Sequence, residues 1–595
     1  MTEQNRSQEV TQTSWKPRIQ SVIEVLPEEI DDLESEIKRF QSGESDPLKF
    51  QAVRLRQGVY GQRHADAQMI RVKIPFGGLT ADQLDGLGDA AEKFTPLKKG
   101  HVTTRENIQF HHVNLSDTPT FLRVIGDVGL STREACGNTV RNVTGCAMAG
   151  VCADEPFDVT PYAAAYSRFF VRHPFTQALP RKLKTAFSGC ERDCAITAIH
   201  DMGFIPRIVD GKRGFKVVAG GGTSIMPRIA PTLYEFVPVE EYLKVTEAVI
   251  RIFHRSDDLR KNRMKARIKF LIARIGIDEF RDMVVEELKE PWAEGSFDPT
   301  PLLYIDDELS DAPSLTTSYE TDGHLPDFEQ WVETNVQPQK QQGYQVVTIK
   351  LPLGDIQAEQ FHQLAGMSRK YAAGRARITV QQNITFRWVP EMALQKVWQE
   401  LKEIGLNEAG AHGITDVVTC PGTDSCKLGI TSSMGVGRAL KEILAKQDTS
   451  DPLINQMHVK ASGCPNGCGQ HHIADIGFHG AMIKGPGGQV PAYELFLGGS
   501  YDEGDTRIGL RVKTRVPTKR LPEALEKLLN FYRDERDEGE PFKDFVARLG
   551  APAFEPILAE FKEVPELNKD TLDYYMDWEK TVKYMMERGE GECAI

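Results

Sequence analysis

The sequence predicts an α+β protein that consists of two related halves. The spacing Cys-x5-Cys begins at Cys146 and again at Cys420, and the spacing Cys-x3-Cys begins at Cys190 and again at Cys464. Strand-like stretches recur in the same order before both cysteine patterns. Solenoid repeats have periods of about 20 to 50 residues, and this period is far longer. We therefore interpret it as one internal duplication.

Each half begins with an expected strand, helix and strand. Met69–Phe76 alternates apolar and polar residues, as a half-buried strand does. Thr80-Ala81-Asp82-Gln83 has the capping-box pattern that starts a helix, and a second strand is expected over Asn107–Val113. The second half repeats this order in two stretches, Val346–Leu353 and Arg377–Phe386. Further helices are expected at Glu240–Arg255, Asp258–Ile275 and Leu521–Glu538.

Four cysteines of the second half lie in turns rich in glycine and proline. Cys420, Cys426, Cys464 and Cys468 can converge as thiolates on one [4Fe–4S] cube, which is the favoured interpretation. Structural zinc is an alternative, although its cysteines usually come in tighter pairs. Disulfides are disfavoured because no signal peptide is apparent and cytosolic thiols stay reduced. Inert core cysteines are the remaining alternative.

The overall composition excludes several classes of function. A net charge of −13 argues against a general nucleic-acid binder, although a local basic pocket could still hold an anion. No apolar run reaches the roughly 18 residues that a membrane span needs, so we expect a cytoplasmic protein with no membrane partner. No glycine-rich nucleotide fingerprint lies between a strand and a helix. Flavin and nicotinamide cofactors, if used, are expected on another protein.

The two halves differ in charge at four equivalent positions. Because Lys182 and Lys184 lie two apart in an expected strand, both should project from one face. Arginine offers a fork of donors to an oxyanion, and lysine offers a charge and a proton. A single such residue would be read as a solvated surface charge, but the joint loss of all four indicates an anion site. The aligned pairs are Arg105 with Gln381, Arg141 with Thr415, Lys182 with Gln456, and Lys184 with His458.

The second-half cysteine motifs closely resemble those of the sirohaem-containing sulfite and nitrite reductases. Thr419-Cys420-Pro421 and Gly463-Cys464-Pro465-Asn466-Gly467-Cys468-Gly469 carry the resemblance, which extends from about residue 50 to residue 550 and is strongest to the assimilatory sulfite reductase haemoproteins. It implies that Cys468 binds both the cube and the sirohaem iron. It also implies that Arg105, Arg141, Lys182 and Lys184 line the opposite face of the sirohaem. Lys184 favours sulfite, because sulfite-reducing members resemble Lys-x-Lys at the positions of Lys182 and Lys184, whereas plant-type nitrite reductases carry Lys-x-Asn.

The resemblance implies six-electron reduction of sulfite to sulfide. The alternative in the same class is six-electron reduction of nitrite to ammonia by the same cofactors. A less favoured alternative is a non-catalytic iron–sulfur redox protein. The electron donor is expected to be ferredoxin or a separate flavoprotein.

The remaining cysteines depart from the family pattern. Cys146, Cys152, Cys190 and Cys194 keep the spacing of a second cluster site, but Glu191-Arg192-Asp193 replaces Pro465-Asn466-Gly467. Carboxylates beside an anionic cluster cost electrostatic energy, so a relic is favoured over a second [4Fe–4S] cluster. Some relatives carry a Tyr–Cys crosslink near Cys136, but no tyrosine follows Gln62-Arg63, and a free thiol is expected. Cys593 is expected to be an exposed thiol of the tail.

The repeat and its flanks divide the chain into seven predicted segments. Residues 291–342 are rich in Pro, Asp, Ser and Thr and lack periodicity, which is typical of a linker. The polar N-terminal arm should contain one helix near Glu28–Phe40 and begin in disorder. The predicted segments are the arm (1–50), a ferredoxin-like unit (51–130), a sirohaem- and anion-binding unit (131–290), the linker (291–342), a second ferredoxin-like unit (343–405), a cluster and sirohaem unit (406–555) and the tail (556–595).

Overall fold

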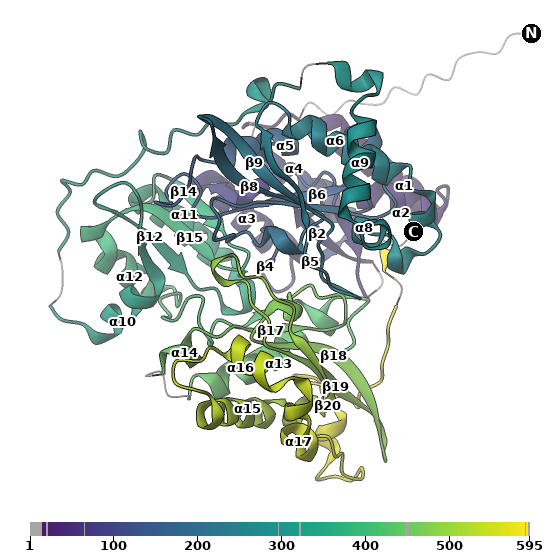
Figure 1. The fold of residues 1–595 in the computed structure, drawn as a ribbon, viewed down its shortest axis with the longest axis vertical. Helices are drawn as coiled ribbons and strands as arrows, with labels where there is room; N and C mark the ends of the chain where they lie inside the picture. The colour runs from purple at the N-terminus through teal and green to yellow at the C-terminus, as the bar shows by residue number, and fades with distance from the viewer. Residues whose placement is uncertain are drawn as a thin grey trace, which may run out of the picture.

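The described strands form four five-stranded sheets in two matching pairs. The computed structural model describes residues 15–19, 22–64, 66–295, 297–320, 323–446, 451–589 and 591–592. Each half contributes one small antiparallel sheet and one larger mixed sheet, and Figure 1 shows the second larger sheet and its helices as a separate lobe below the rest. The predicted α+β fold with two duplicated halves is confirmed.

The first small sheet carries two helices on one face. Its helix α3 (Ala81–Phe94) begins with the predicted capping box, in which the Thr80 hydroxyl accepts from the Gln83 amide and the Gln83 side chain accepts from the Thr80 amide. Helix α4 (Thr118–Asp127) comes after strand β5 along the chain. In spatial order the strands are β1 (Val59–Gly61), β2 (Ala67–Val72), β5 (Ile108–Asn114), β4 (Lys99–Val102) and β13 (Asp355–Gln357).

The second small sheet has the same arrangement. Its helices are α11 (Ala358–Tyr371) and α12 (Leu394–Glu403). In spatial order the strands are β11 (Val336–Pro338), β12 (Tyr344–Ile349), β15 (Ile384–Pro390), β14 (Arg375–Ile378) and β3 (Gly78–Thr80).

The two small sheets exchange their edge strands. Strand β3 belongs to the first half in sequence but pairs with β14 of the second, where Thr80 lies opposite Arg375. Strand β13 makes the reciprocal pairing with β4, where Asp355 lies opposite His101. Helices α3 and α11 pack against each other, and one hydrophobic core includes residues of both sheets. The two small units therefore form a single body at the junction of the halves.

The two larger sheets share one topology. In each, the first three strands are parallel and the last two are antiparallel additions. The first is β6 (Val140–Gly145), β7 (Leu183–Phe187), β8 (Met202–Val209), β9 (Lys212–Ala219) and β10 (Thr232–Pro238), with helices α5 (Thr160–Phe170), α6 (Tyr242–His254), α8 (Ile268–Ile275) and α9 (Ile277–Glu287). The second is β16 (Val418–Thr419), β17 (Val459–Ser462), β18 (Ile476–Gly485), β19 (Gly488–Leu497) and β20 (Leu510–Pro517), with α13 (Ser433–Leu444), α15 (Leu521–Glu535) and α16 (Phe542–Leu549).

Two expected elements differ in detail from the structure. The helix expected over Asp258–Ile275 is two helices, α7 (Asp257–Arg260) and α8, because the Asn262 side chain accepts from the Met264 amide at 3.0 Å and makes a turn between them. The linker region contains helix α10 (Pro326–Asn335), whose Trp331 is fully buried in the shared core. Apolar side chains can thus anchor even a stretch with little periodicity.

The first and last described segments of the chain both lie at the first half. The expected N-terminal helix is present as α1 (Pro27–Gln41), followed by α2 (Pro47–Arg56). The expected disorder at the start of the arm and the expected exposure of Cys593 concern positions outside the described residues. From the lower lobe in Figure 1 the C-terminal segment runs back up to the region of α2 and α8. No described helix combines the length and the apolar character that crossing a membrane requires.

Candidate active site between the halves

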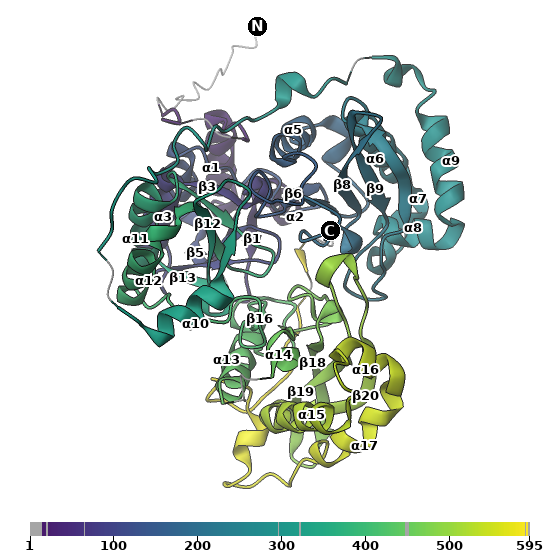
Figure 2. The ribbon, with the colours of Figure 1, turned by 60° about the vertical axis from the view of Figure 1, so that its left-hand side comes forward.

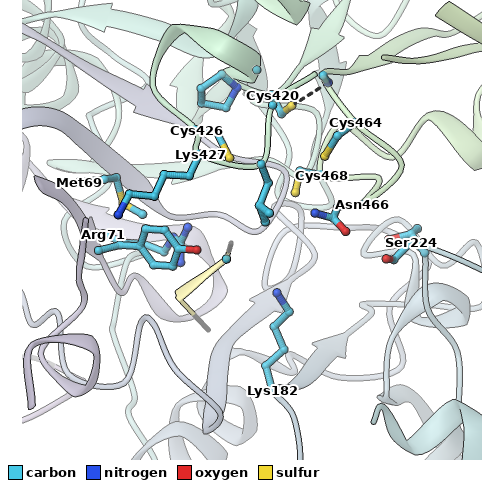
Figure 3. Close-up of a pocket in the computed structure, with 18 of the residues that line it drawn as sticks. Met69, Arg71, Lys182, Ser224, Cys420, Cys426, Lys427, Cys464, Asn466 and Cys468 are labelled. Carbon is cyan, nitrogen blue, oxygen red and sulfur yellow. Dashed lines mark hydrogen bonds between the residues drawn. The ribbon is translucent and has the colours of Figure 1, made fainter. Parts of the chain in front are cut away.

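Two adjoining cavities lie where the two halves meet. Their volumes are about 270 and 130 Å³, and both are lined by Arg141, Lys182 and Lys184 from the first half and by Cys420 and Cys468 from the second. Figure 3 shows the cysteine sulfurs on one side of this space and Lys182 pointing toward it from the opposite side. In Figure 2 the first large sheet, with β8 and β9 labelled, lies above the lobe that contains β18, β19 and β20. Neither half could enclose this space alone.

The second-half cysteines lie on tight turns that need glycine at positions 422 and 463. Cys420 follows β16, and Cys464 follows β17, so the two parallel strands deliver both turns to one edge of the sheet. At Gly422 the backbone has φ +53°, and a Cβ there would lie 2.5 Å from the Ser433 hydroxyl. At Gly463 a Cβ would lie 2.6 Å from the Gly422 Cα. The glycines therefore allow the two cysteine turns to touch.

Hydrogen-bond donors already approach these sulfurs. The Gly463 amide donates to Cys420 Sγ at 3.3 Å, and the Ser433 hydroxyl lies 3.4 Å from the same sulfur. Burial raises the pKa of Cys420 to about 12 and also raises the pKa of Cys426. Metal ligation requires thiolates, so iron binding at this site releases protons. Amide donors of this kind are the interactions that tune an iron–sulfur cluster.

The structure brings the four cations of the first half together. Arg105, Arg141, Lys182 and Lys184 all line the smaller cavity, which also contains Cys468. Lys184 lies on β7, and Lys182 immediately precedes that strand, so both side chains reach the cavity as their two-residue spacing predicts. The four positions identified by comparing the halves therefore share one wall, and Cys468 lies in the same cavity.

One buried carboxylate, Asp201, holds this wall in place. Asp201 Oδ2 accepts from the Lys184 amide at 2.7 Å, while both oxygens of Asp201 accept from Arg267 at 2.7 Å. Burial lowers the pKa of the Lys184 ammonium well below its usual value, and the nearby cations Arg267, Arg105 and Lys182 lower it further. Lys184 is thus a lysine that gives up a proton readily.

Arg105 retains donor capacity toward the cavity. Its Nη2 donates to the carbonyls of Asn142 and Thr185, whereas its buried Nη1 has no hydrogen-bond partner among the described residues. The neighbouring Thr104 hydroxyl donates to the Cys468 carbonyl at 2.9 Å and so links this wall to the cysteine turn. A buried donor without a partner is costly. An anionic ligand in the cavity would remove that cost.

Sequence reasoning missed further cations in the cavity. Arg71, on β2, lines both cavities and donates to the Ala135 carbonyl and to Cys136 Sγ. A signal for it existed, because Arg71 aligns with Thr348 in the second half. Lys269 also lines the larger cavity, where it donates to carbonyls of the loop 222–226. Lys269 aligns with Lys543, so comparing the halves gives no signal for it.

The buried thiol Cys136 has an aromatic neighbour that the sequence reasoning overlooked. No tyrosine follows Gln62-Arg63, but Tyr60 precedes them and packs against the small cluster of Cys136, Met69 and Leu55. Tyr60 also lines the larger cavity. No disulfide joins Cys136 to another described cysteine, and a tyrosine is packed beside its cluster.

The C-terminal tail closes one side of the larger cavity. Gly591 lines it, and the next residue, Glu592, is almost fully buried. The Glu592 carboxylate accepts from Arg54 at 2.7 Å through both oxygens, from the Gly61 amide at 2.8 Å and from Lys427 at 3.0 Å. This one carboxylate therefore joins the first half to the loop that follows Cys426.

The residues present suit a large anionic macrocycle beside a cluster. The cavities supply many cations, an Arg105 donor without a partner, and four cysteines on tight turns. Sirohaem carries several carboxylates, which such cations can neutralise. Fold and site together define a duplicated α+β oxidoreductase with an iron–sulfur centre at the junction of its halves.

The chain belongs to the nitrite and sulfite reductase family. The model described as "Nitrite and sulphite reductase 4Fe-4S domain" matches residues 136–292 and 410–564, and the model described as "Nitrite/Sulfite reductase ferredoxin-like half domain" matches residues 60–128 and 337–404. The double match of each model agrees with the duplicated sheets. Sirohaem and a [4Fe–4S] cluster are the cofactors of this family.

Relatives of both substrate types are similar to the chain. A ferredoxin–nitrite reductase of Synechococcus elongatus is 31% identical over 78% of this chain and 85% of its own length. A sulfite reductase [ferredoxin] of Mycobacterium tuberculosis is 30% identical over 81% of this chain and 82% of its own length. The solved structure of Mycobacterium tuberculosis NirA protein is 26% identical, with a TM-score of 0.73 over 91% of this chain and 98% of that chain. The family is thereby established, whereas its members' names divide between two substrates.

Proposed function

We propose that the protein catalyses the six-electron reduction of sulfite to sulfide. The observation that carries the proposal is Lys184, which lies in the cation-lined cavity with Cys468. Sulfite has three oxygens, and all three must leave as water. A wall of two arginines and two lysines suits an oxyanion that has to be held and protonated repeatedly. Nitrite, with two oxygens, is the alternative substrate, because relatives named for it are similarly close.

Residues of both halves take part in the proposed mechanism. Cys420, Cys426, Cys464 and Cys468 would hold the cluster, with Cys468 also ligating the sirohaem iron. When bound, these cofactors would relay electrons from the donor and provide the iron to which the substrate binds. Arg105 and Arg141 would orient the anion's oxygens. Lys182 and Lys184 would give protons to oxygens as they leave.

We infer that ferredoxin is the electron donor. Relatives named as ferredoxin-dependent support this inference. The proposed reaction consumes six electrons, which a one-electron donor would deliver singly. A test is reduction of the protein by photoreduced ferredoxin, compared with reduction by a flavodoxin-type donor. Faster turnover with the flavoprotein would contradict the inference.

The decisive experiment compares sulfite and nitrite on anaerobically prepared holoenzyme. Turnover would be measured with reduced viologen on the wild type and on Lys184→Asn, with Lys212→Asn, an exposed lysine of β9, as the matched control. We expect higher kcat/KM for sulfite in the wild type and the control, and a shift toward nitrite in Lys184→Asn. Efficient nitrite reduction by the wild type, with only slow sulfite reduction, would reverse the substrate assignment. Absence of turnover with either anion would favour a non-catalytic redox protein.

A further inference from the structure

The four first-half cysteines gather on turns equivalent to those of the second half. Cys146 follows β6, and Cys190 follows β7, as Cys420 follows β16 and Cys464 follows β17. A Cβ on Gly189 would lie 3.3 Å from Cys146 Sγ, so the two turns of this quartet also pack against each other. All four belong to the first segment that matches the 4Fe–4S domain model. The duplication has therefore preserved the geometry of a cluster site as well as the spacing.

The backbone of the turn is preserved although its glycine is not. Asp193 stands at the position of Gly467 and adopts the same left-handed conformation, with φ +51° against +68°. Aspartate is one of the few residues with a side chain that tolerates this region. Two further pairs match: Ile196 and Gln470 have φ +53° and +62°, and Ser188 and Ser462 both accept, through their hydroxyls, from the amide seven residues on.

The two carboxylates of the turn are directed elsewhere. Asp193 accepts from the amide and hydroxyl of Thr197 at 2.9 and 2.8 Å, so it caps the short helix that follows. Glu191 pairs with Arg207 at 2.7 Å. The residue between them, Arg192, lies beside Cys152 and Cys190 and pairs with the Asp154 carboxylate at 2.9 Å. Neither carboxylate of the turn therefore faces the sulfurs, and the nearby Asp154 carboxylate is paired with a cation.

We propose that Cys146, Cys152, Cys190 and Cys194 bind a second [4Fe–4S] cluster. Arg192 offsets part of the negative charge of such a cluster, as amide donors do at the other quartet. Structural zinc is the other occupant that four cysteines suit, and the metal count described below separates the two.

The second cluster would have no sirohaem beside it. Cys468 and its equivalent Cys194 are both exposed, but Cys468 lines the cation-lined cavity, whereas Cys194 lies on the side where a loop of the second half lies. Arg192 reaches Glu503 of that loop at 3.7 Å, and a Cβ on Gly504 would lie 2.7 Å from the Glu191 carbonyl. The site is thus an uncoupled, surface cluster that can exchange electrons with an external donor.

The primary test counts iron and acid-labile sulfide in anaerobically purified full-length protein. We expect about eight non-sirohaem irons per chain in the wild type and about four in Cys190→Ser/Cys194→Ser, with the sirohaem absorbance unchanged. About four irons in the wild type would overturn the proposal. So would one zinc per chain that the double variant loses. The iron count does not depend on the substrate, so it can fail or succeed independently of the proposed function.

A second measurement needs no cysteine variant and covers the case in which the double variant does not fold. Reduced wild type should show a spectrum of an isolated [4Fe–4S]⁺ cluster in addition to the sirohaem-coupled signal. In Arg192→Gln, which keeps all four thiols, this isolated signal should appear only at a more negative potential while the coupled signal does not move. Absence of an isolated signal in fully reduced wild type would overturn the proposal.

Discussion

The two cysteine quartets have the same backbone and very different neighbours. The second-half quartet opens onto a cavity whose cations come from the first half, and the first-half quartet is accompanied by Arg192 and a loop of the second half. The duplication thus kept the turns and divided the chemistry. One half supplies sulfur ligands and the other supplies cations, so the candidate active site needs both.

The largest expected effect comes from substituting each of two equivalent cysteines in turn. Cys468→Ala should abolish turnover and the sirohaem absorbance, because the proposed shared ligand is gone. Cys194→Ala, its equivalent in the first half, should keep the sirohaem absorbance and most of the viologen-driven turnover. Absorption spectra and steady-state rates measure both effects. Equal loss in the two variants would contradict the division of roles.

The next effect concerns the cations. Lys182→Gln/Lys184→His installs the residues that the second half has at these positions, Gln456 and His458. Removing preorganised charge of this kind costs about 10² to 10³ in kcat, and we expect a loss of at least that size in sulfite turnover. Gln456→Lys in the second half is the control and should leave turnover within about twofold. Unchanged turnover in the double variant would show that the cation wall is not used.

A third effect concerns the contact that joins the tail to the first half. Glu592→Gln leaves Arg54 buried without its charged partner, and breaking a buried pair costs about 3 kcal/mol or more. Glu587→Gln is the control, because Glu587 is mostly exposed and meets Arg63 only at 3.6 Å. Chemical denaturation of both variants gives their free energies of unfolding. A similarly small loss of stability in both variants would mean that the Arg54–Glu592 pair does not hold the tail.

The same carboxylate gives a pH dependence. Burial opposes ionisation of Glu592, but the hydrogen bonds from Arg54 outweigh burial and lower its pKa. Its stabilisation is therefore fully present above the unfolded pKa of about 4.3 and is lost as pH falls through the lower folded value. The stability difference between wild type and Glu592→Gln should shrink on acidification below about pH 4.3. A stability difference that grows below about pH 4.3 would contradict a lowered pKa for Glu592.

The smallest expected effect compares the two turns directly. Asp193→Gly restores the residue of the second half, which favours the left-handed backbone but removes the cap on Thr197. Loss of a cap costs about 1 kcal/mol, and the relief of strain offsets part of it. We expect a net loss below about 1 kcal/mol in denaturation, with an unchanged iron content. Loss of iron would mean that Asp193 does more than shape the turn.

Much of the architecture was predictable because it repeats. The alternation of Met69–Phe76, the capping box at Thr80 and the cysteine spacings each appear twice or carry a local signature. Four cation positions followed from comparing the halves. The exchange of β3 and β13 was not predictable, because the sequence of a three-residue strand does not indicate which strand it will pair with.

The missed site residues have different causes. Arg71 could have been found, since its partner in the second half is Thr348. The direction of the Glu191 and Asp193 carboxylates could not, because sequence gives the charge of a side chain but not the amide it caps. Glu592 was also hidden, since its partner Arg54 lies at the other end of the chain and pairs with it only after folding.

The exchanged strands constrain how such a protein could have arisen. A chain with only one half would lack the fifth strand of its small sheet and would expose the edge of β4 or β14. A second copy could supply that strand reciprocally, as a domain-swapped homodimer. Fusion of two copies into one gene would then allow each to change separately, and cations could be lost from one copy while the other kept them.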